Sequence, residues 1–404
     1  MVEMKKYKLG DIADFDKKTL SKKDSMDVIE YLDTGSLTEN IFGPMQVLSR
    51  QDAPSRAQRR VFDKTILYST VRPRLKHYGF MEKPKENVIV STGFVTIDVK
   101  DKFKNVIDPY YLYLLLIQDE ITEYLGTIAD TAVSSYPSLN PSDIQMLEFE
   151  FPDLSIQKKI ASVPYNIDKR IENLRAQNRV LEQTAKTIYD YTFLQCAGHQ
   201  TTYNKTLNRN IPADWEQKSL SQIESNIITG KTPSTECEDN FGGNISFITI
   251  DDIRQNTYII KTARTLSEKG ANTQSKKYLP EGSLCVSCIG TIGEVGFSVG
   301  SAQTNQQINS IVFFEDLNKY YLYFAIKEYF QYATPKQGAT FGNMSKGEFE
   351  GIKLIYPDRA TLEKFNMEVA PLFQKQLVNI KQIEALTIQR NTLLPLLMTG
   401  QVEV

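Results

Sequence analysis

The sequence predicts an α+β (mixed α/β) chain with two similar globular parts, each followed by a long helix. Three observations lead to this prediction. Short motifs recur in the same order at offsets of 205 to 217 residues. Two stretches that follow the globular parts carry apolar residues at helical spacing. A length of 404 residues gives room for two or three domains of about 150 residues each.

The repeat sets the predicted boundaries. Phe151-Pro152-Asp153 recurs as Tyr356-Pro357-Asp358, and each copy follows a strand-like run and precedes a helical pattern. Further upstream, residues 67–80 align with 284–297, and residues 31–34 align with 247–250. The common order of these matches predicts a duplication. We therefore expect globular parts at 1–153 and 201–358, and helical parts at 154–200 and 359–404.

Within the globular parts, short apolar runs broken by Gly, Pro, Asn and Asp predict strands. These strands are expected at 88–90, 94–97, 245–250 and 308–314. Helices are expected at 108–124 and 317–332. Pro109 suits the first turn of the earlier helix, where its missing N–H costs nothing.

The first helical part has a heptad pattern, in which apolar residues form a seam along one face. Its seam positions are Ile160, Ile167, Ile171, Leu174, Asn178, Leu181 and Ile188. Asn178 on this seam would favour one register. Pro164 is expected to kink or restart the helix, since proline lacks a backbone donor. Residues 165–194 would then form a helix of roughly 45 Å.

The second helical part, residues 361–397, keeps an approximate 3.5-residue spacing that includes Ile380, Ile383 and Leu393. Pro371 and Pro395 are expected to interrupt it. A helix with an apolar seam needs a partner. We expect the two helices to pair within the chain as an antiparallel coiled coil with pseudo-twofold symmetry. Homodimerisation, or burial of each helix on its own domain, is the alternative.

Composition limits the classes of function. The chain has 47 basic and 49 acidic residues, so DNA binding would need local basic patches or a partner. The amino terminus has no apolar core, and the longest apolar run, 110–117, is too short to span a membrane. Four cysteines do not make a disulfide scaffold in a chain of this length. These features predict a cytoplasmic protein without a membrane segment.

Several motifs suggest other chemistry. Gly230-Lys231-Thr232 lacks the earlier glycine of a phosphate-binding loop. Cys285 and Cys288 form a C-x-x-C without a second pair, which disfavours zinc. A metal-dependent nuclease using Asp153 or Asp358 remains an alternative, as does a coiled-coil scaffold that does not read DNA. Otherwise the sequence predicts no catalytic or metal-binding residue.

The junction residues resemble those of a known family. Leu139-Asn140-Pro141-Ser142-Asp143-Ile144 and residues 149–161 resemble the junction between a target recognition domain and a spacer helix. That junction is found in the specificity subunit of type I restriction-modification systems. Residues 67–73, 230–234, 289–293 and 393–400 are similar to further family segments, so the resemblance covers essentially the whole chain. Asp153, Ile156 and Pro164 depart from the family pattern.

The resemblance implies that 1–153 and 201–358 are target recognition domains and that the two helical parts are conserved spacer helices. Such a subunit reads a bipartite double-stranded DNA target, one half-site per domain, and is not itself catalytic. Two methyltransferase subunits would methylate adenine with S-adenosylmethionine, and restriction motor subunits would join for cleavage. The chain itself would bind no cofactor. The helix pair would act as a ruler that sets the gap between half-sites.

Base edges and phosphates are read by Arg, Lys, Asn, Gln and small hydroxyl side chains. In the first part the candidates are Arg56, Arg59, Arg60, Thr70, Arg72, Arg74 and Lys76. In the second they are Lys231, Thr232, Ser234, Arg254, Asn305, Gln306 and Thr340. Loops at 131–136 and 338–343 occupy matching places and are also expected to face DNA. For every one of these residues, an ordinary solvated surface is the alternative.

Overall fold

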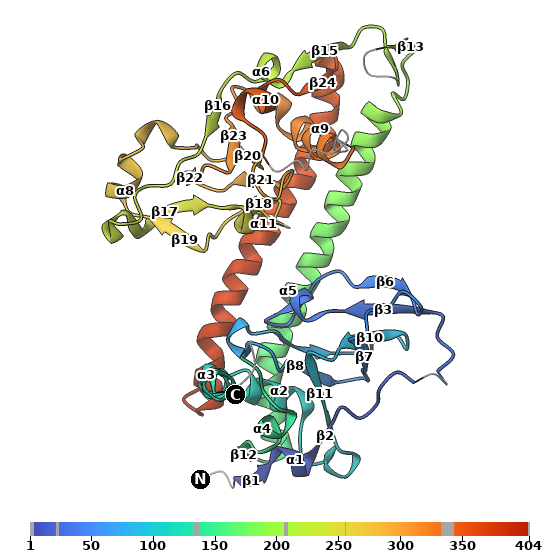
Figure 1. The fold of residues 1–404 in the computed structure, drawn as a ribbon, viewed down its shortest axis with the longest axis vertical. Helices are drawn as coiled ribbons and strands as arrows, with labels where there is room; N and C mark the ends of the chain where they lie inside the picture. Colours follow the sequence, from blue (N-terminus) through green and yellow to red (C-terminus); the bar gives the residue numbers. More distant parts are fainter. Residues whose placement is uncertain are drawn as a thin grey trace. The chain divides into compact units, whose positions relative to one another are not determined.

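A computed structural model of the chain describes residues 4–21, 24–131, 137–205, 209–254, 256–332 and 343–402. The chain divides into two compact units (Figure 1). The first contains residues 1–170 and 386–404, and the second contains residues 171–385. Each unit therefore includes one globular part and a segment of both long helices.

The first unit is mixed α/β. Its elements are β1 (Lys5–Lys8), α1 (Leu9–Ile12), β2 (Ala13–Phe15), β3 (Val28–Leu32), η1 (Thr34–Ser36), β4 (Leu37–Thr38), β5 (Ile41–Phe42), β6 (Gln46–Ser49), β7 (Ala57–Arg60), β8 (Thr65–Ser69), η2 (Pro73–Leu75), β9 (Tyr78–Met81), β10 (Val88–Ser91), β11 (Phe94–Val99), η3 (Asp101–Phe103), α2 (Pro109–Leu116), α3 (Asp119–Asp130), α4 (Pro141–Gln145), β12 (Glu148–Phe151) and the start of α5 (Leu154–Tyr189). Two four-stranded sheets have the orders β6-β3-β10-β7 and β2-β11-β8-β9, and β1 pairs with β12. All six residues of β11 are buried, which makes it the centre of the first core.

The second unit is also mixed α/β. It contains the end of α5, a π-helical turn η4 (Asp190–Leu194), β13 (Thr201–Asn204), β14 (Arg209–Pro212), β15 (Glu216–Ser219), α6 (Leu220–Ile223), β16 (Ile227–Thr229), η5 (Glu238–Asn240), β17 (Phe241–Ile248), α7 (Ile250–Ile253), β18 (Tyr258–Ile259), β19 (Arg264–Leu266), α8 (Glu268–Asn272), η6 (Ser275–Lys277), β20 (Leu284–Ser287), β21 (Val295–Ser298), β22 (Ala302–Thr304), β23 (Ile308–Ile311), η7 (Asp316–Asn318), α9 (Lys319–Tyr332), α10 (Lys346–Glu350), β24 (Lys353–Tyr356) and most of α11 (Arg359–Met398). Its larger sheets have the orders β16-β23-β20-β21-β18 and β19-β17-β22.

The two units share one strand plan. β2-β11-β8-β9 corresponds to β16-β23-β20-β21, and every neighbouring pair in both sets is antiparallel. The parallel pair β3 and β10 corresponds to the parallel pair β17 and β22. The antiparallel pair β1 and β12 corresponds to β15 and β24. The predicted duplication and the α+β class are therefore confirmed.

The local elements depart from the sequence prediction in places. The helix expected at 108–124 is two helices, α2 and α3, because Gln118 takes an extended conformation between them. Pro109 does occupy the first turn of α2, where the Asp108 carboxylate accepts hydrogen bonds from two backbone N–H groups. The strand expected at 308–314 ends at Ile311. The strand expected at 245–250 is the end of β17 only as far as Ile248, because Thr249 caps α7, which begins at Ile250.

The three prolines do not interrupt the long helices, which corrects the prediction. α5 continues through Pro164 over 36 residues, and α11 continues through Pro371 and Pro395 over 40 residues. A proline in a helix removes one backbone donor and crowds the preceding turn. Around Pro164, burial in the first core offsets this cost: Ala161 is 5% exposed, and Ile160 and Tyr165 pack against the same cluster.

The two long helices contact each other in an antiparallel sense, as the second unit shows by itself. The rings of Tyr189 on α5 and Phe365 on α11 have centroids 6.2 Å apart. Earlier on α5, the Asn178 carbonyl accepts a 2.9 Å hydrogen bond from the side chain of Gln376, further along α11. All ten predicted seam residues are buried or half-buried. Coiled-coil packing and the pseudo-twofold relation between the units stay predictions.

The helix contact in the second unit contains a buried polar layer. Gln376 is 2% exposed and Asn379 is fully buried. Asn379 donates from Nδ2 to Asn178 Oδ1 across 2.9 Å. The side-chain oxygens of Gln376 and Asn379 accept no hydrogen bond from the described part of the chain. A buried polar layer of this kind selects one register and lowers stability.

The two strand-to-helix junctions use different chemistry at matching positions. Gln157 near the start of α5 is fully buried, and its side chain bonds three backbone groups, those of Asp108, Val106 and Pro152. At the offset of 205 residues, Leu362 takes this place on α11 and is also fully buried. The second junction therefore replaces a polar contact by apolar packing.

Candidate nucleic-acid interface

The basic cluster at 55–60 is largely neutralised by its own unit. Arg59 forms a 2.6 Å ion pair with Asp16, and Arg60 a 3.2 Å ion pair with Asp24. Burial raises the pKa of the Asp16 carboxyl, although the hydrogen bond from Thr96 and the charge of Arg59 oppose this rise. Arg56 is exposed, and its backbone carbonyl accepts a 2.9 Å hydrogen bond from Thr92.

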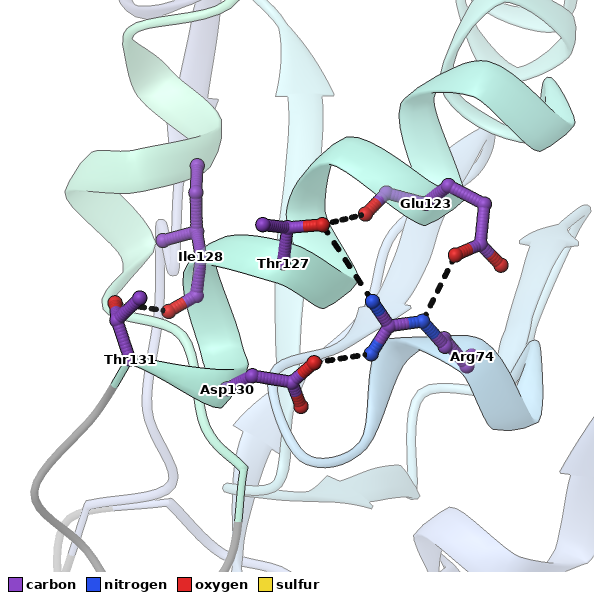
Figure 2. Close-up of polar contacts among 6 residues, drawn as sticks. All are labelled: Arg74, Glu123, Thr127, Ile128, Asp130 and Thr131. Atoms are coloured by element: carbon purple, nitrogen blue, oxygen red, sulfur yellow. Dashed lines mark hydrogen bonds and ion pairs between the residues drawn. The ribbon is translucent and has the colours of Figure 1, made fainter.

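Arg74 joins the turn after β8 to helix α3 (Figure 2). Its Nε atom lies 2.9 Å from a carboxylate oxygen of Glu123, and its Nη1 atom lies 2.7 Å from one of Asp130. The guanidinium lies against Gly126, where an added Cβ would come within 2.7 Å of Arg74 Cζ. Arg74 therefore holds the turn after β8 against α3, a role that its sequence context does not predict.

Lys76 is also paired within its unit. Its ammonium lies 2.7 Å from Asp119 and 3.7 Å from Glu39, and hydrogen bonding to Asp119 raises the pKa of Lys76. Four of the seven candidates in the first part, Arg59, Arg60, Arg74 and Lys76, thus contact acidic side chains. Their net attraction for a phosphate is correspondingly reduced.

Thr70 and Arg72 lie in a group of segments that we call the first edge, residues 70–72, 91–93 and 137–139. The Thr70 N–H donates to the Gly93 carbonyl (2.9 Å), and the Thr70 carbonyl accepts from Leu139 (2.8 Å). The Arg72 N–H donates to the Pro137 carbonyl (3.0 Å). Arg72 is exposed and has a φ of +47°.

In the second unit the structure brings together several candidates that are far apart in the sequence. The Thr232 hydroxyl donates to Gln306 Oε1 across 2.8 Å. The Lys231 N–H donates to the Thr304 carbonyl (2.9 Å), and an added Cβ on Gly230 would lie 2.2 Å from the Asn305 carbonyl oxygen. The bare Gly230 is what allows these two turns to touch. Lys231 and Gln306 are both exposed.

These turns adjoin the segment after β20, and together they form the second edge, residues 288–290, 305–307 and 343–344. The Asn305 side chain donates to Gln307 Oε1 across 2.9 Å. The Gln307 carbonyl accepts from Cys288 (2.8 Å). Gln307 and Asn343 belong to this edge although neither was a single candidate. The amide run at 304–307 and the loop at 338–343 were the available signals.

The remaining candidates lie at different places. Arg254, at the end of α7, forms a 3.2 Å ion pair with Asp251 and donates to the Thr291 hydroxyl at 3.4 Å. Ser234 is exposed, and its carbonyl accepts from Asn240. Thr340 and most of the loops expected to face DNA, 132–136 and 338–342, lie outside the described residues.

Two carboxylates on α5 that were not among the candidates, Asp168 and Glu182, each hold the globular part of their own unit. Asp168 accepts a 2.7 Å hydrogen bond from Tyr110, and Glu182 accepts one of 2.7 Å from Tyr323. The tyrosines belong to the repeated sequence Tyr-Tyr-Leu-Tyr at 110–113 and 320–323. That repeat, at an offset of 210 residues, marks the matching segments, although Tyr110 is the first and Tyr323 the fourth residue of its copy.

The residues considered for zinc binding or nuclease activity lie in the core or cap a helix. Cys285 and Cys288 are buried, and burial raises the pKa of the Cys285 thiol to about 12 and that of Cys288 to about 11. Asp358 caps α11 by accepting from the Thr361 N–H at 2.9 Å. Among the described residues, no group of three or more His, Cys, Asp or Glu side chains could hold a metal ion. No helix in the described ranges is long and apolar enough to cross a membrane.

Comparison with known proteins agrees with this fold. The family model of the type I restriction modification DNA specificity domain matches residues 1–183 and 212–390. The chain therefore belongs to the family of type I restriction-modification DNA specificity domains. It is a DNA sequence-specificity subunit with two recognition domains, and catalysis in such systems lies in partner subunits.

Individual relatives span the chain. It is 29% identical to the type I restriction enzyme HindI specificity subunit of Haemophilus influenzae, over 100% of both chains. It is 27% identical to the MjaIX specificity subunit of Methanocaldococcus jannaschii, over 85% of this chain and 79% of that relative. The crystal structure of a type I S subunit from M. genitalium has a similar fold, with a TM-score of 0.57 and 16% identity over 98% of this chain and 96% of that one.

Proposed function

We propose that the chain reads a bipartite DNA target, with one half-site for each recognition domain. The observation that supports this is the shared strand plan, on which the two domains display different exposed polar side chains. The domains we propose are 1–153 and 201–358, with spacer helices at 154–200 and 359–404. The limits at 153 and 358 are supported by two junctions: β12 ends at Phe151 before α5 starts at Leu154, and β24 ends at Tyr356 before α11 starts at Arg359.

The relatives are named specificity subunits of type I restriction enzymes, and we propose the same assembly for this chain. Two methyltransferase subunits would bind it and methylate adenine with S-adenosylmethionine, and restriction motor subunits would join for cleavage. The chain itself would bind DNA and no cofactor. A complex of this kind acts on the cell's own DNA, so we place it in the cytoplasm.

The charges of the chain support a division of labour. The chain has 47 basic and 49 acidic residues, and four cations near its first edge are already paired. Tight binding to DNA usually needs several Lys or Arg side chains that can neutralise phosphates. We expect the isolated chain to bind DNA weakly, with sequence selectivity appearing when methyltransferase subunits are added. Tight and specific binding by the isolated chain would contradict this.

The pair of long helices is proposed to act as a coiled-coil ruler. α5 has 36 residues, or roughly 54 Å of helix, compared with about 34–36 Å for one turn of B-DNA. Insertion of four residues near Asn178, with a compensating insertion in α11, should change the unread gap or abolish activity. An active complex with an unchanged gap would refute the ruler.

The central experiment is methylome sequencing of a host with and without the chain. Loss of one bipartite adenine-methylation motif is the expected result. Exchange of residues 1–153 for the same part of a family relative should then change one half of the motif. A change in both halves, or in neither, would contradict the assignment of one half-site to each domain.

A further inference from the structure

The two edges have the same backbone hydrogen bonds in both units. In the first, Thr70 donates to Gly93 and Leu139 donates to Thr70, at 2.9 and 2.8 Å. In the second, Cys288 donates to Gln307 and Met344 donates to Cys288, at 2.8 and 2.7 Å. An isolated β-bridge joins Val71 to Ser138, and another joins Ile289 to Asn343.

These bonds establish which positions correspond, independently of sequence similarity. The corresponding pairs are Thr70 with Cys288, Val71 with Ile289, Arg72 with Gly290, Thr92 with Gln306, Gly93 with Gln307, and Ser138 with Asn343. The backbone is therefore repeated while the side chains differ in charge and hydrogen-bonding groups. A repeated support with exchanged side chains is what two domains need in order to read different half-sites.

The pair Arg72 and Gly290 is the most informative. Both residues are left-handed, with φ of +47° and +81°. This conformation is unfavourable for arginine and natural for glycine. The second domain uses the relaxed residue, so the backbone alone does not require arginine in the first. Several other non-glycine residues of the chain have a positive φ, so the strain at Arg72 gains meaning from its place on the first edge, opposite a glycine at the corresponding position of the second.

In the second edge the exposed hydrogen-bonding side chain lies on the neighbouring turn, at Gln306. Gln306 is exposed, and its Oε1 atom accepts from the Thr232 hydroxyl at 2.8 Å. That bond restricts the amide to one orientation and leaves the second lone pair of Oε1 and the Nε2 donors to make further contacts. A Cβ added to Gly290 would lie 3.5 Å from Nε2 of Gln307, the residue after Gln306.

We propose that these corresponding edges carry the specificity-determining residues: Arg72 reads a guanine in the first half-site, and Gln306, positioned by Thr232, reads an adenine in the second. Arginine pairs with guanine O6 and N7, and glutamine pairs with adenine N6 and N7, in the major groove. This inference rests on the proposed function, because it presupposes one half-site for each domain.

The test uses the chain assembled with its methyltransferase partner and a library of DNA targets, sequenced for adenine methylation. The wild-type complex must give a bipartite motif; its absence would contradict the proposed function and not this inference. Arg72→Gly should reduce discrimination at one guanine of the first half-site at least roughly fivefold. The second half-site should stay unchanged, and the melting temperature should be kept or raised because glycine suits the left-handed position.

Lys64→Gly is the matched control. Lys64 is exposed, has a φ of +69°, and lies in the same unit outside the first edge. The Lys64→Gly variant loses one positive charge and one left-handed side chain, as Arg72→Gly does. Because Lys64 lies outside the first edge, the methylated motif should equal that of the wild type. An unchanged first half-site in the Arg72→Gly complex would overturn the proposal. Equal weakening by both variants at all sequences would also overturn it, because it would indicate a general charge effect.

The second domain provides an independent comparison. Gln306→Ala and Thr232→Val should both relax the same adenine position of the second half-site and leave the first half-site intact. Thr232→Ser should restore the wild-type motif, since serine keeps the hydroxyl that holds the amide. If Thr232→Val matched the wild type, or if serine failed to rescue it, the positioning role of Thr232 would be wrong.

Discussion

Arg390 on α11 donates from Nη1 to Oδ1 of Asp168 on α5 across 2.9 Å, within the first unit. The two side chains are 15% and 12% exposed, so the pair is largely withdrawn from water. Tyr110 donates to the other carboxylate oxygen, Oδ2, at 2.7 Å. Asp168 therefore connects both long helices with the recognition domain of that unit.

Asp168→Ala is expected to lower the free energy of unfolding of the first unit by about 3–5 kcal/mol. The substitution leaves the Arg390 guanidinium without its counter-charge in a site with little water. Urea denaturation followed by circular dichroism measures the effect. The exposed pair Arg359 and Glu363 provides the comparison, and Glu363→Ala should change stability much less, because water screens this pair. Equal losses in the two variants would show that burial of the Asp168 and Arg390 pair does not increase its contribution to the free energy of unfolding.

The polar layer between the helices in the second unit leads to an opposite expectation. Gln376→Leu should raise stability by about 1 kcal/mol, because it removes a buried oxygen that accepts no hydrogen bond from the described residues. Asn379→Leu should give a smaller gain, because it also removes the donor to Asn178 Oδ1. The register of the helix pair should become less specific, so the methylated motif should show more than one gap length. Gln389→Leu, at an exposed position of α11, serves as control. A stabilised variant that keeps one unchanged gap would show that the polar layer does not select the register of the helices.

Gly126→Ala tests the contact between Arg74 and α3. Alanine normally stabilises a helix relative to glycine, but here its Cβ would lie 2.7 Å from the guanidinium carbon. The end of the Arg74 side chain can move aside, so we expect a small fall in melting temperature as its ion pairs with Glu123 and Asp130 are weakened. Gly347→Ala in α10 meets no atom within 4 Å and should be neutral or stabilising. If Arg74→Ala fails to relieve the Gly126→Ala defect, the clash is not its cause.

Glu182 predicts a pH dependence of the second unit. Burial alone would raise the pKa of its carboxyl, but the charge of Lys327 and hydrogen bonds from Lys327, Tyr323 and Thr257 hold that pKa below the ordinary 4.5. A depressed pKa means that the folded state binds the proton less readily than the unfolded state. The stabilisation is then complete above pH 4.5 and is lost as pH falls through the folded pKa.

Glu182→Gln should remove this contribution. The difference in unfolding midpoint between wild type and variant should be largest near pH 7 and shrink below pH 4.5. Thermal unfolding across pH 3 to 7 measures it. A difference that is constant with pH would mean that the carboxylate contributes through packing and not through its charge.

Much of the fold could be predicted from the sequence, because a duplication leaves its marks in order along the chain. The matches at Phe151 and Tyr356, and at 67–80 and 284–297, gave the plan of both units. The seam positions lie in buried or half-buried places because apolar periodicity depends only on helix geometry. The interruption predicted at the prolines was wrong; at Pro164 the cost of one lost backbone bond is offset by tertiary packing that no local pattern contains.

The candidate interface was harder to predict for a physical reason. A basic residue in a sequence shows its charge but not its partner. Arg59, Arg60, Arg74 and Lys76 all have acidic partners 36 to 56 residues away along the chain. The bond between Thr232 and Gln306 likewise joins residues 74 positions apart. Such pairings depend on sheet order, which composition and spacing do not encode.

The burial of the cysteines makes the second recognition domain easy to label. Cys196, Cys285 and Cys288 are buried with raised pKa values, so their thiols react slowly, while Cys237 is partly exposed. A maleimide fluorophore should therefore attach at Cys237 in the wild-type chain. Its emission could then be followed as duplex oligonucleotides are added, without any engineered cysteine.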